Sequence, residues 1–147
     1  MFQLEYKIQD VAPLSTIFTK DVIANYLKIF SFLWKLKKVQ HYLSLSWGIN
    51  MANQSEFRKI QGPLQNQFHR FTLAHHEMAL FVQNVHNYIL VEVLESAWTE
   101  FKIKLETVKD LDQLILIQRQ FVSDILDRSL LSDKQRDLYK LVQKLLN

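Results

Sequence analysis

A chain of 147 residues, 48% of them hydrophobic, has the length of one domain and enough apolar side chains for a buried core. Two glycines and two prolines in the whole sequence argue against disorder, and the absence of cysteine excludes a disulfide framework and a thiolate metal site. The formal net charge of +3 does not point to nucleic acid, whose binding proteins usually carry a concentrated basic stripe. No uncharged apolar run reaches the roughly eighteen residues of a membrane-spanning helix, so we expect no membrane insertion.

Residues 1–9 alternate between apolar and polar side chains, with Phe2, Leu4, Tyr6 and Ile8 in the apolar positions. A period of two predicts an extended segment with one buried face. Because a single short strand cannot form a sheet alone, we expect this segment to lie along helices.

The first long helix is predicted to follow Thr19 and to continue to about residue 47. Thr19 is a suitable N-cap, and Asp21 stands in the first turn, where the helix dipole favours an acid. Two apolar stripes recur at helical spacing, and Phe30 and Trp34 belong to the second. A helix with two such stripes is either buried between neighbours or turns one stripe toward another protein.

A basic cluster follows Trp34 and contains Lys35, Lys37 and Lys38. Such clusters usually form a solvated face. Aromatic residues edged by basic ones also suit the acidic surface of a protein partner, and the sequence leaves both interpretations open.

The polar residues 48–62 hold both glycines and predict the main loop, and Pro63 suits the first turn of a helix. A second long helix is predicted over about residues 64–105, which contain no glycine or proline. Its apolar line changes face midway, so we expect a change of packing partner and a kink there. The line of the second half contains Leu90, Leu94, Trp98, Phe101 and Leu105.

Two shorter helices complete the chain. Asp110 is predicted to cap a helix that ends near Leu131, and Ser132 to cap a last helix that contains Leu138 and Val142. The predicted fold class is therefore all-α. We expect a single helical domain over residues 1–147, a bundle of two long helices and two shorter C-terminal helices with an extended N-terminal segment.

The sequence offers little support for catalysis. It contains no glycine-rich phosphate loop and no nucleophile–base signature. His69, His75, His76 and His86 lack the spacing of a zinc protease, and surface or interface positions explain them better. We therefore expect no enzyme, cofactor or metal site. An enzyme fragment that uses these histidines is a rival hypothesis, which metal analysis of the purified chain would test.

A polar strip follows the second long helix. Asn84, Tyr88, Glu95 and Lys102 are separated by four, seven and seven residues, which places them on one face of an α-helix. The strip is either a solvent-facing surface or a polar docking strip, and the spacing alone favours the solvent-facing surface.

Five strings, taken in order, resemble the C-terminal domain of the gamma-tubulin complex proteins, and in particular of their third component. They are LEYKIQ (4–9), APLSTIFT (12–19), NYLKIFSFLWKLKKVQHYL (25–43), EMALFVQNVHNYILVEVLESAW (77–98) and KDLDQLILIQRQFVSDILDRSLL (109–131). Each string is weakly diagnostic by itself, but their order over this length is specific.

The resemblance implies a non-catalytic, all-helical module that binds gamma-tubulin, with other gamma-tubulin complex components as further partners. Such modules template microtubule nucleation in the cytoplasm, at centrosomes or spindle poles. As a hypothesis, the gamma-tubulin contacts are Phe30, Trp34, Lys35 and Lys38 on the first long helix and Asn84, Tyr88 and Glu95 on the polar strip. The alternative is a structural helical subunit that binds other complex components without contacting tubulin.

The chain also departs from the pattern of the family that it resembles. Gln118 stands where a histidine is usual and Ser129 where a cysteine is common, and we interpret both as core or interface adjustments. The family's C-terminal domain begins well upstream of the position that matches Met1. We therefore expect the chain to correspond to the later part of that domain.

Overall fold

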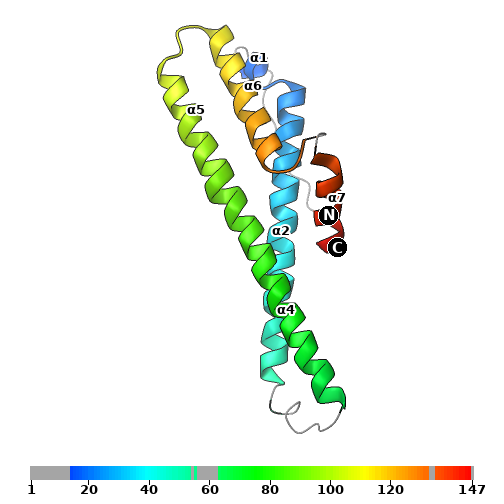
Figure 1. Cartoon of the computed structure of the whole chain (residues 1–147). Coiled ribbons are helices and arrows are strands. Elements are labelled where there is room, and N and C mark those ends of the chain that lie inside the picture. The colour runs from blue at the N-terminus through cyan, green and yellow to red at the C-terminus, as the bar shows by residue number, and fades with distance from the viewer. Residues whose placement is uncertain (1–13, 54, 56–62, 133–134, 147) are drawn as a thin grey trace. The chain divides into compact units, whose positions relative to one another are not determined.

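The computed structural model describes residues 14–53, 55, 63–132 and 135–146, and every regular element within them is helical (Figure 1). This confirms the all-α prediction. The predicted extended segment at residues 1–9 lies outside the described residues. The elements are α1 (Leu14–Ile17), α2 (Lys20–Ala52), α4 (Pro63–Asn87), the π-helix η1 (Tyr88–Glu95), α5 (Ser96–Glu106), α6 (Leu111–Arg128) and α7 (Arg136–Leu145).

The chain divides into two compact units. Unit 1 comprises residues 1–33 and 88–147, and unit 2 comprises residues 34–87. The long helix α2 therefore contributes its first turns to unit 1 and its remaining turns to unit 2. That residues 1–147 act as a single domain stays a prediction, and each unit is described below by itself.

Helix α2 begins as predicted but ends later. The Thr19 hydroxyl accepts a hydrogen bond from the Val22 N–H at 3.5 Å. The helix then continues through Gly48, which costs about 1 kcal/mol in a helix interior and is too little to stop it. The helix ends where both the backbone N–H and the side-chain amide of Asn53 donate to the Ile49 carbonyl, at 3.2 and 3.0 Å. The prediction of a loop from residue 48 was therefore wrong at its start.

The second long helical run covers residues 63–106, close to the predicted 64–105, and it begins at Pro63 as expected. Its middle is η1, eight residues of π-helix, in which each N–H bonds five residues back and a turn contains more residues than an α-turn. Residues four apart are rotated by about 40° on an α-helix, but they stay closer to one face of a π-helix because its turn is wider. This keeps Ile89, Val93 and Ala97 buried on one line.

The π-helix explains why the predicted second apolar face was only partly right. Leu90 and Trp98 are exposed, whereas Leu94 is half-buried. The residues that fill the interior instead are Val93 and Ala97. The expected change in the middle of the helix therefore takes the form of a wide helical turn.

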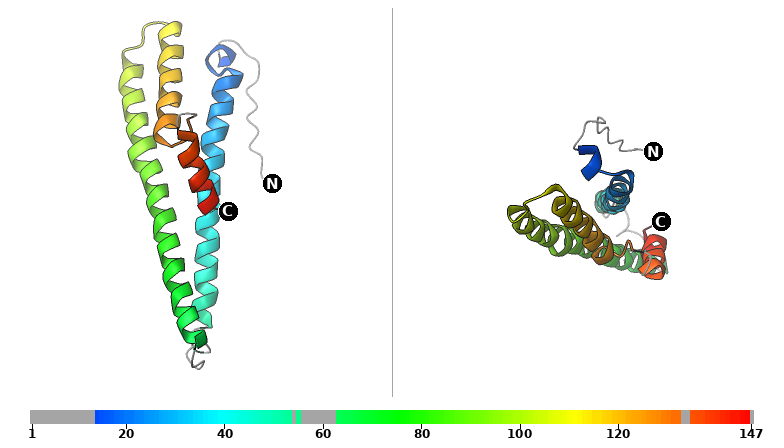
Figure 2. Two further views of the ribbon diagram at one scale, coloured as in Figure 1. Left: turned by 45° about the vertical axis from the view of Figure 1, so that its right-hand side comes forward. Right: turned by 90° about the horizontal axis from the view of Figure 1, so that it is seen from above.

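Unit 1 has its core where α2, η1, α5 and α6 meet. Buried Ile29, Val93, Ala97 and Ile125 form this core, and Phe121 packs against it with Leu33, Leu94, Leu126 and Leu131. Helices α5 and α6 run antiparallel, side by side (Figures 1 and 2). From α7, Tyr139 lies edge-on against buried Phe32 at 5.7 Å between ring centroids.

The ends of α6 follow from local hydrogen bonds. Asp110 is the N-cap as predicted, and its carboxylate accepts the Gln113 N–H at 2.7 Å. The helix ends at Arg128, three residues before the predicted Leu131. It ends there because Leu130 adopts a left-handed conformation (φ 63°) and the N–H groups of Leu130 and Leu131 bond back to the carbonyls of residues 127 and 126.

The last helix begins later than predicted. Ser132 does not cap it, because the residue before α7 is Gln135, whose side chain makes no capping hydrogen bond. The Gln135 N–H donates instead to the Ser132 carbonyl at 3.1 Å.

Candidate partner-binding surface

Five side chains on the unit 2 part of α2 form a solvent-exposed line, which we call the α2 stripe. They follow one another at steps of three or four residues, so they share one helix face. They are Trp34, Lys38, Tyr42, Leu45 and Ile49. The four apolar or aromatic members expose 46, 57, 51 and 62% of their surface in chain order. Four large apolar or aromatic side chains exposed on one helix face are typical of an interaction site, whereas single exposed apolar residues are common on any surface.

The aromatic part of the α2 stripe has a basic residue between its two rings. The Lys38 ammonium lies 5.7 Å from the centroid of the Tyr42 ring, one turn further along the helix. A cation–π contact at an exposed site contributes about 0.5–1 kcal/mol and restrains both side chains. Trp and Tyr are the residues most often found at the energetic centre of protein interfaces.

The four predicted contacts on α2 divide between the two units. Trp34 and Lys38 belong to the α2 stripe. Lys35 is half-buried and lies about 100° around the helix from Trp34. Phe30 is half-buried and lies one turn before Trp34, within unit 1.

The predicted polar strip does not form one continuous face. Asn84 is exposed on α4, and Tyr88 and Glu95 are the exposed first and last residues of η1. Seven residues return to nearly the same face of an α-helix but not of a π-helix, because the π-turn is wider. The spacing argument that grouped Tyr88 with Glu95 was therefore wrong, whereas the role of each in binding stays a prediction.

Sequence reasoning missed three members of the α2 stripe, Tyr42, Leu45 and Ile49. They continue the same helical line from Trp34, so the signal was present in the sequence. Ile49 was missed because the loop was predicted to begin at Gly48, whereas Tyr42 and Leu45 lay within the predicted helix and were not linked to Trp34.

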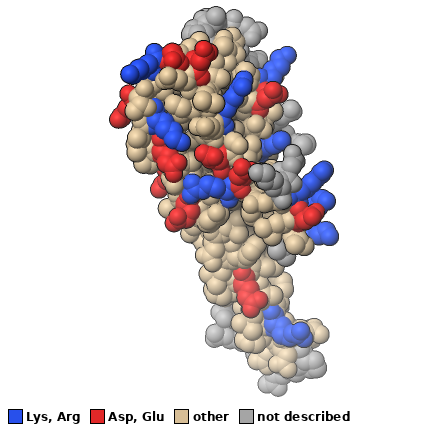
Figure 3. Space-filling view, turned by 45° about the horizontal axis from the view of Figure 1, so that its top comes forward, with Lys and Arg blue, Asp and Glu red and all other residues tan. Residues whose placement is uncertain are grey.

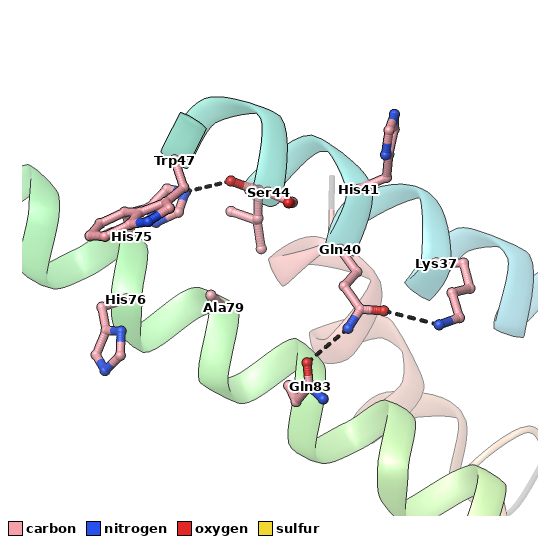
Figure 4. Close-up of a pocket in the computed structure, with 10 residues that line it drawn as sticks. Lys37, Gln40, His41, Ser44, Trp47, His75, His76, Ala79 and Gln83 are labelled. Atoms are coloured by element: carbon pink, nitrogen blue, oxygen red, sulfur yellow. Dashed lines mark hydrogen bonds between the residues drawn. The ribbon is translucent and has the colours of Figure 1, made fainter. Parts of the chain in front are cut away.

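A groove lies on a different face of α2, between this helix and α4 in unit 2 (Figure 4). Its volume is about 580 Å³. The Gln40 side-chain amide crosses it and donates to the Gln83 side-chain oxygen at 2.8 Å, while the Lys37 ammonium donates to Gln40 at 3.3 Å. These bonds tie the two helices together at one end of the groove.

At the other end of the groove, His75 fixes α4 against α2. Its Nε2 donates to the Leu43 carbonyl at 2.9 Å, and its ring stacks on Trp47 with centroids 5.6 Å apart. Because a carbonyl can only accept, Nε2 carries the proton in this tautomer. The buried Nδ1 then has a lone pair and no hydrogen-bond partner among the described residues.

Unit 2 is the basic part of the molecule. Residues 34–87 contain six Lys or Arg and two acidic residues, a net charge of +4, so the remaining residues carry −1 of the chain's +3. All five histidines also lie in this unit. On the face drawn in Figure 3, charged side chains of both signs are interspersed over unit 1 and are sparse over the hairpin of α2 and α4.

One of these histidines has a lowered pKa. His86 is buried, and burial lowers its pKa below the ordinary value of 6.5. The positive charge of Lys37 acts in the same direction, and a hydrogen bond with the Asn87 side chain opposes both. His86 therefore contributes to the packing of unit 2 as an uncharged ring.

Within ranges 14–53, 55, 63–132 and 135–146, no three His, Asp or Glu side chains are grouped as a metal site would require. No helix in the described part of the chain is long and apolar enough to cross a membrane.

Comparison with known proteins decides the family. The profile of the gamma tubulin complex component C-terminal family matches residues 1–147. The chain belongs to this family. Its membership agrees with the all-helical fold and with the resemblance seen in the sequence strings.

The chain has named relatives in several organisms. It is 36% identical over 145 residues to gamma-tubulin complex component 3 of Arabidopsis thaliana, covering 94% of the chain and 17% of that protein. It is 30% identical over 138 residues to gamma-tubulin complex component 3 of Homo sapiens, covering 94% of the chain and 15% of that protein. It is 33% identical over 148 residues to spindle pole body component 98 of Dictyostelium discoideum, covering 100% of the chain and 18% of that protein. The chain therefore spans less than a fifth of the length of these relatives.

The two departures from the family pattern fall in the interior of this family member. Gln118 is 4% exposed and Ser129 is 1% exposed, both in unit 1. Of the two predicted alternatives, core or interface, the burial of both side chains agrees with the core. Each carries a buried side-chain oxygen without a hydrogen-bond partner among the described residues.

Proposed function

We propose that this chain is a gamma-tubulin-binding module of a gamma-tubulin complex and contributes to microtubule nucleation at cytoplasmic microtubule-organising centres. The family match over residues 1–147 carries the proposal. Relatives named as gamma-tubulin complex component 3 and as spindle pole body component 98 support the same assembly and location. The other components of such a complex are its further partners.

The α2 stripe is the surface that we assign to gamma-tubulin. Trp34 and Tyr42 present two rigid aromatic side chains on one helix face, with Lys38 between them. Large aromatic groups bury much area at a small cost in side-chain entropy, which makes them effective anchors. Phe30, Lys35, Asn84, Tyr88 and Glu95 remain predicted contacts around this centre.

The proposed role needs no catalytic group, because the task is geometric. Each module fixes one gamma-tubulin, and the assembly holds many such copies at a set spacing. A growing microtubule then gains avidity from many weak sites in register. Contacts on a regular helix suit this role, since a helix holds its side chains at fixed distances.

The experiment is co-elution of the full chain with purified gamma-tubulin, followed by an affinity measurement on a variant with both Trp34→Ala and Tyr42→Ala. Truncating two interface anchors should weaken binding by about 30-fold or more, since one such residue typically contributes about 2 kcal/mol. The matched control carries Phe71→Ala and Leu80→Ala, two exposed apolar residues of α4. Its affinity should stay within about twofold, and helical circular dichroism should be unchanged in both variants.

Other results separate the two candidate functions. A double variant of the α2 stripe that binds gamma-tubulin as well as the unchanged chain would contradict the assignment of the surface. A well-folded chain that does not bind gamma-tubulin but co-elutes with other components would favour the structural-subunit alternative.

A further inference from the structure

The groove of unit 2 and the α2 stripe occupy different faces of one helix. Lys37, Gln40, Ser44 and Trp47 line the groove from α2 at steps of three and four residues. With about 100° of rotation per residue, their line lies roughly 140° around the helix from the α2 stripe. A partner in the groove therefore need not compete with a partner on the stripe.

The floor of the groove is shaped by one small residue on α4. Ala79 lies between His76 and Gln83, all three of which line the groove (Figure 4). A methyl group at this position leaves the space that a longer side chain would fill. The walls are fixed at both ends, by the Gln40–Gln83 hydrogen bond and by the stack of Trp47 on His75.

The polar groups that line the groove include three hydrogen-bond donors, beside acceptors such as the buried Nδ1 of His75. Lys37 supplies an ammonium group, Trp47 an indole N–H, and Gln83 the N–H groups of an amide whose oxygen is already bonded to Gln40. His41 and His76 add two imidazole rings at the rim. Among the described residues that line the groove, none is Asp or Glu.

The charge of the surroundings has the same sign. In the described part of unit 2 the only acidic residue is Glu77, against Lys35, Lys37, Lys38 and Arg70. The Lys37 ammonium is bonded to a neutral amide oxygen, and a carboxylate would be the stronger acceptor. Both facts favour an occupant with negative charge.

The size of the groove suits a short helix. Lys37 and Trp47 are ten residues apart, which corresponds to about 15 Å, or about three turns. A helix laid against two others packs at about 8–10 Å from each, which would complete a three-helix arrangement in unit 2. Unit 2 would gain buried contacts from such a helix, because Leu36 and Val82 are the only apolar residues that are buried in its described part.

We propose that this groove binds an acidic amphipathic helix of a protein partner, with a carboxylate of that helix on Lys37 and a small apolar side chain over Ala79. The proposal does not depend on gamma-tubulin binding, because it uses the other face of α2.

The probe is a synthetic fifteen-residue helical peptide with Glu and Leu at helical spacing, and fluorescence anisotropy measures its binding to the full chain. Saturable binding is expected, and it should weaken as salt is raised. A peptide of the same pattern with Lys in place of Glu should not bind. Absence of saturable binding by the acidic peptide would overturn the proposal.

Two adjacent lysines provide a matched pair of charge reversals. Lys37→Glu, in the groove, should lower the affinity for the acidic peptide by at least about tenfold. Lys38→Glu makes the same change in net charge on the α2 stripe and should lower the affinity by less than about twofold. An equal loss in both variants would show attraction by net charge alone and would overturn the proposal.

A third variant tests the shape of the groove without changing its charge. Ala79→Met keeps a good helix former and fills the floor, so peptide binding should fall by at least about tenfold while helical circular dichroism is retained. Unchanged binding in this variant would also overturn the proposal. Gamma-tubulin co-elution is measured on the same proteins, so failure of the groove and failure of the α2 stripe can be told apart.

Discussion

Tyr88 and Arg128 join the start of the π-helix to the end of α6 within unit 1. The Tyr88 hydroxyl donates to the Arg128 carbonyl at 3.4 Å. In return, the Arg128 guanidinium donates to the Glu92 carbonyl inside η1 and, at 3.4 and 3.5 Å, to the Ser96 hydroxyl at the start of α5. The Arg128 side chain therefore bonds to one group within the π-helix and to one group at the start of the α-helix that follows it.

Replacing Arg128 should destabilise unit 1. Arg128→Ala removes hydrogen bonds from a charged donor, and because the side chain is partly exposed we expect a loss of about 1–2 kcal/mol in the free energy of unfolding. Urea denaturation followed by circular dichroism measures it. The control is Arg119→Ala, an exposed position on α6, which should change stability by less than about 0.5 kcal/mol. Equal stability of both variants would mean that the Arg128 contacts contribute nothing.

Removing the buried hydroxyl of Ser129 should stabilise the protein. Its oxygen is buried without a hydrogen-bond partner among the described residues, and such a group costs about 1–3 kcal/mol. Ser129→Ala should therefore raise the unfolding free energy by about 1 kcal/mol in the same urea experiment. Ser123→Ala, on the exposed face of α6, should have little effect. A loss of stability in Ser129→Ala would show that the hydroxyl is bonded after all.

Stability should fall in mild acid because of His86. Its pKa is lowered in the native state, so the unfolded chain takes up the proton first as the pH falls through the ordinary value of 6.5. The contribution is fully present above that value, declines as the pH falls toward the lowered native pKa, and levels off below it. Thermal unfolding midpoints between pH 8 and pH 5 should therefore decline less in His86→Gln than in the unchanged chain. His69→Gln, at an exposed position, should follow the unchanged chain.

The N-cap of α6 gives a local test. Asp110→Ala removes the acceptor of the 2.7 Å bond from the Gln113 N–H and should cost about 1 kcal/mol. Asp124→Ala removes the same charge from an exposed position one turn before the end of α6 and should not lower the urea midpoint. If both variants lose the same stability, the effect is one of charge and not of capping.

Two neighbouring aromatic residues on α2 should differ strongly in their contribution to stability. Phe32 is 3% exposed and packs edge-on against Tyr139, so Phe32→Ala should cost about 3–5 kcal/mol. Trp34 is 46% exposed, and Trp34→Ala should cost clearly less than Phe32→Ala. Calorimetric unfolding of both variants decides this. A Trp34→Ala variant that melts as early as Phe32→Ala would mark Trp34 as a core residue and not as an interface anchor.

Local sequence patterns were enough to predict the fold class, the two long helices and three of the helix starts. Thr19, Pro63 and Asp110 act through hydrogen bonds and backbone restrictions within a few residues, so their effect can be read from the chain. Local patterns also indicated part of the candidate surface, since Trp34 and Lys38 follow one another at helical spacing. The resemblance to the family pattern was likewise carried by the order of short strings.

Features that depend on contacts between distant segments could not be predicted from local patterns. The π-helix at residues 88–95 keeps Val93 and Ala97 buried and receives the Arg128 side chain, a partner more than thirty residues away. Gly48 stays helical, and Leu130 accepts a left-handed conformation that glycine would adopt more readily. In each case local preference amounts to about 1–2 kcal/mol, which the packing of the surrounding helices can outweigh.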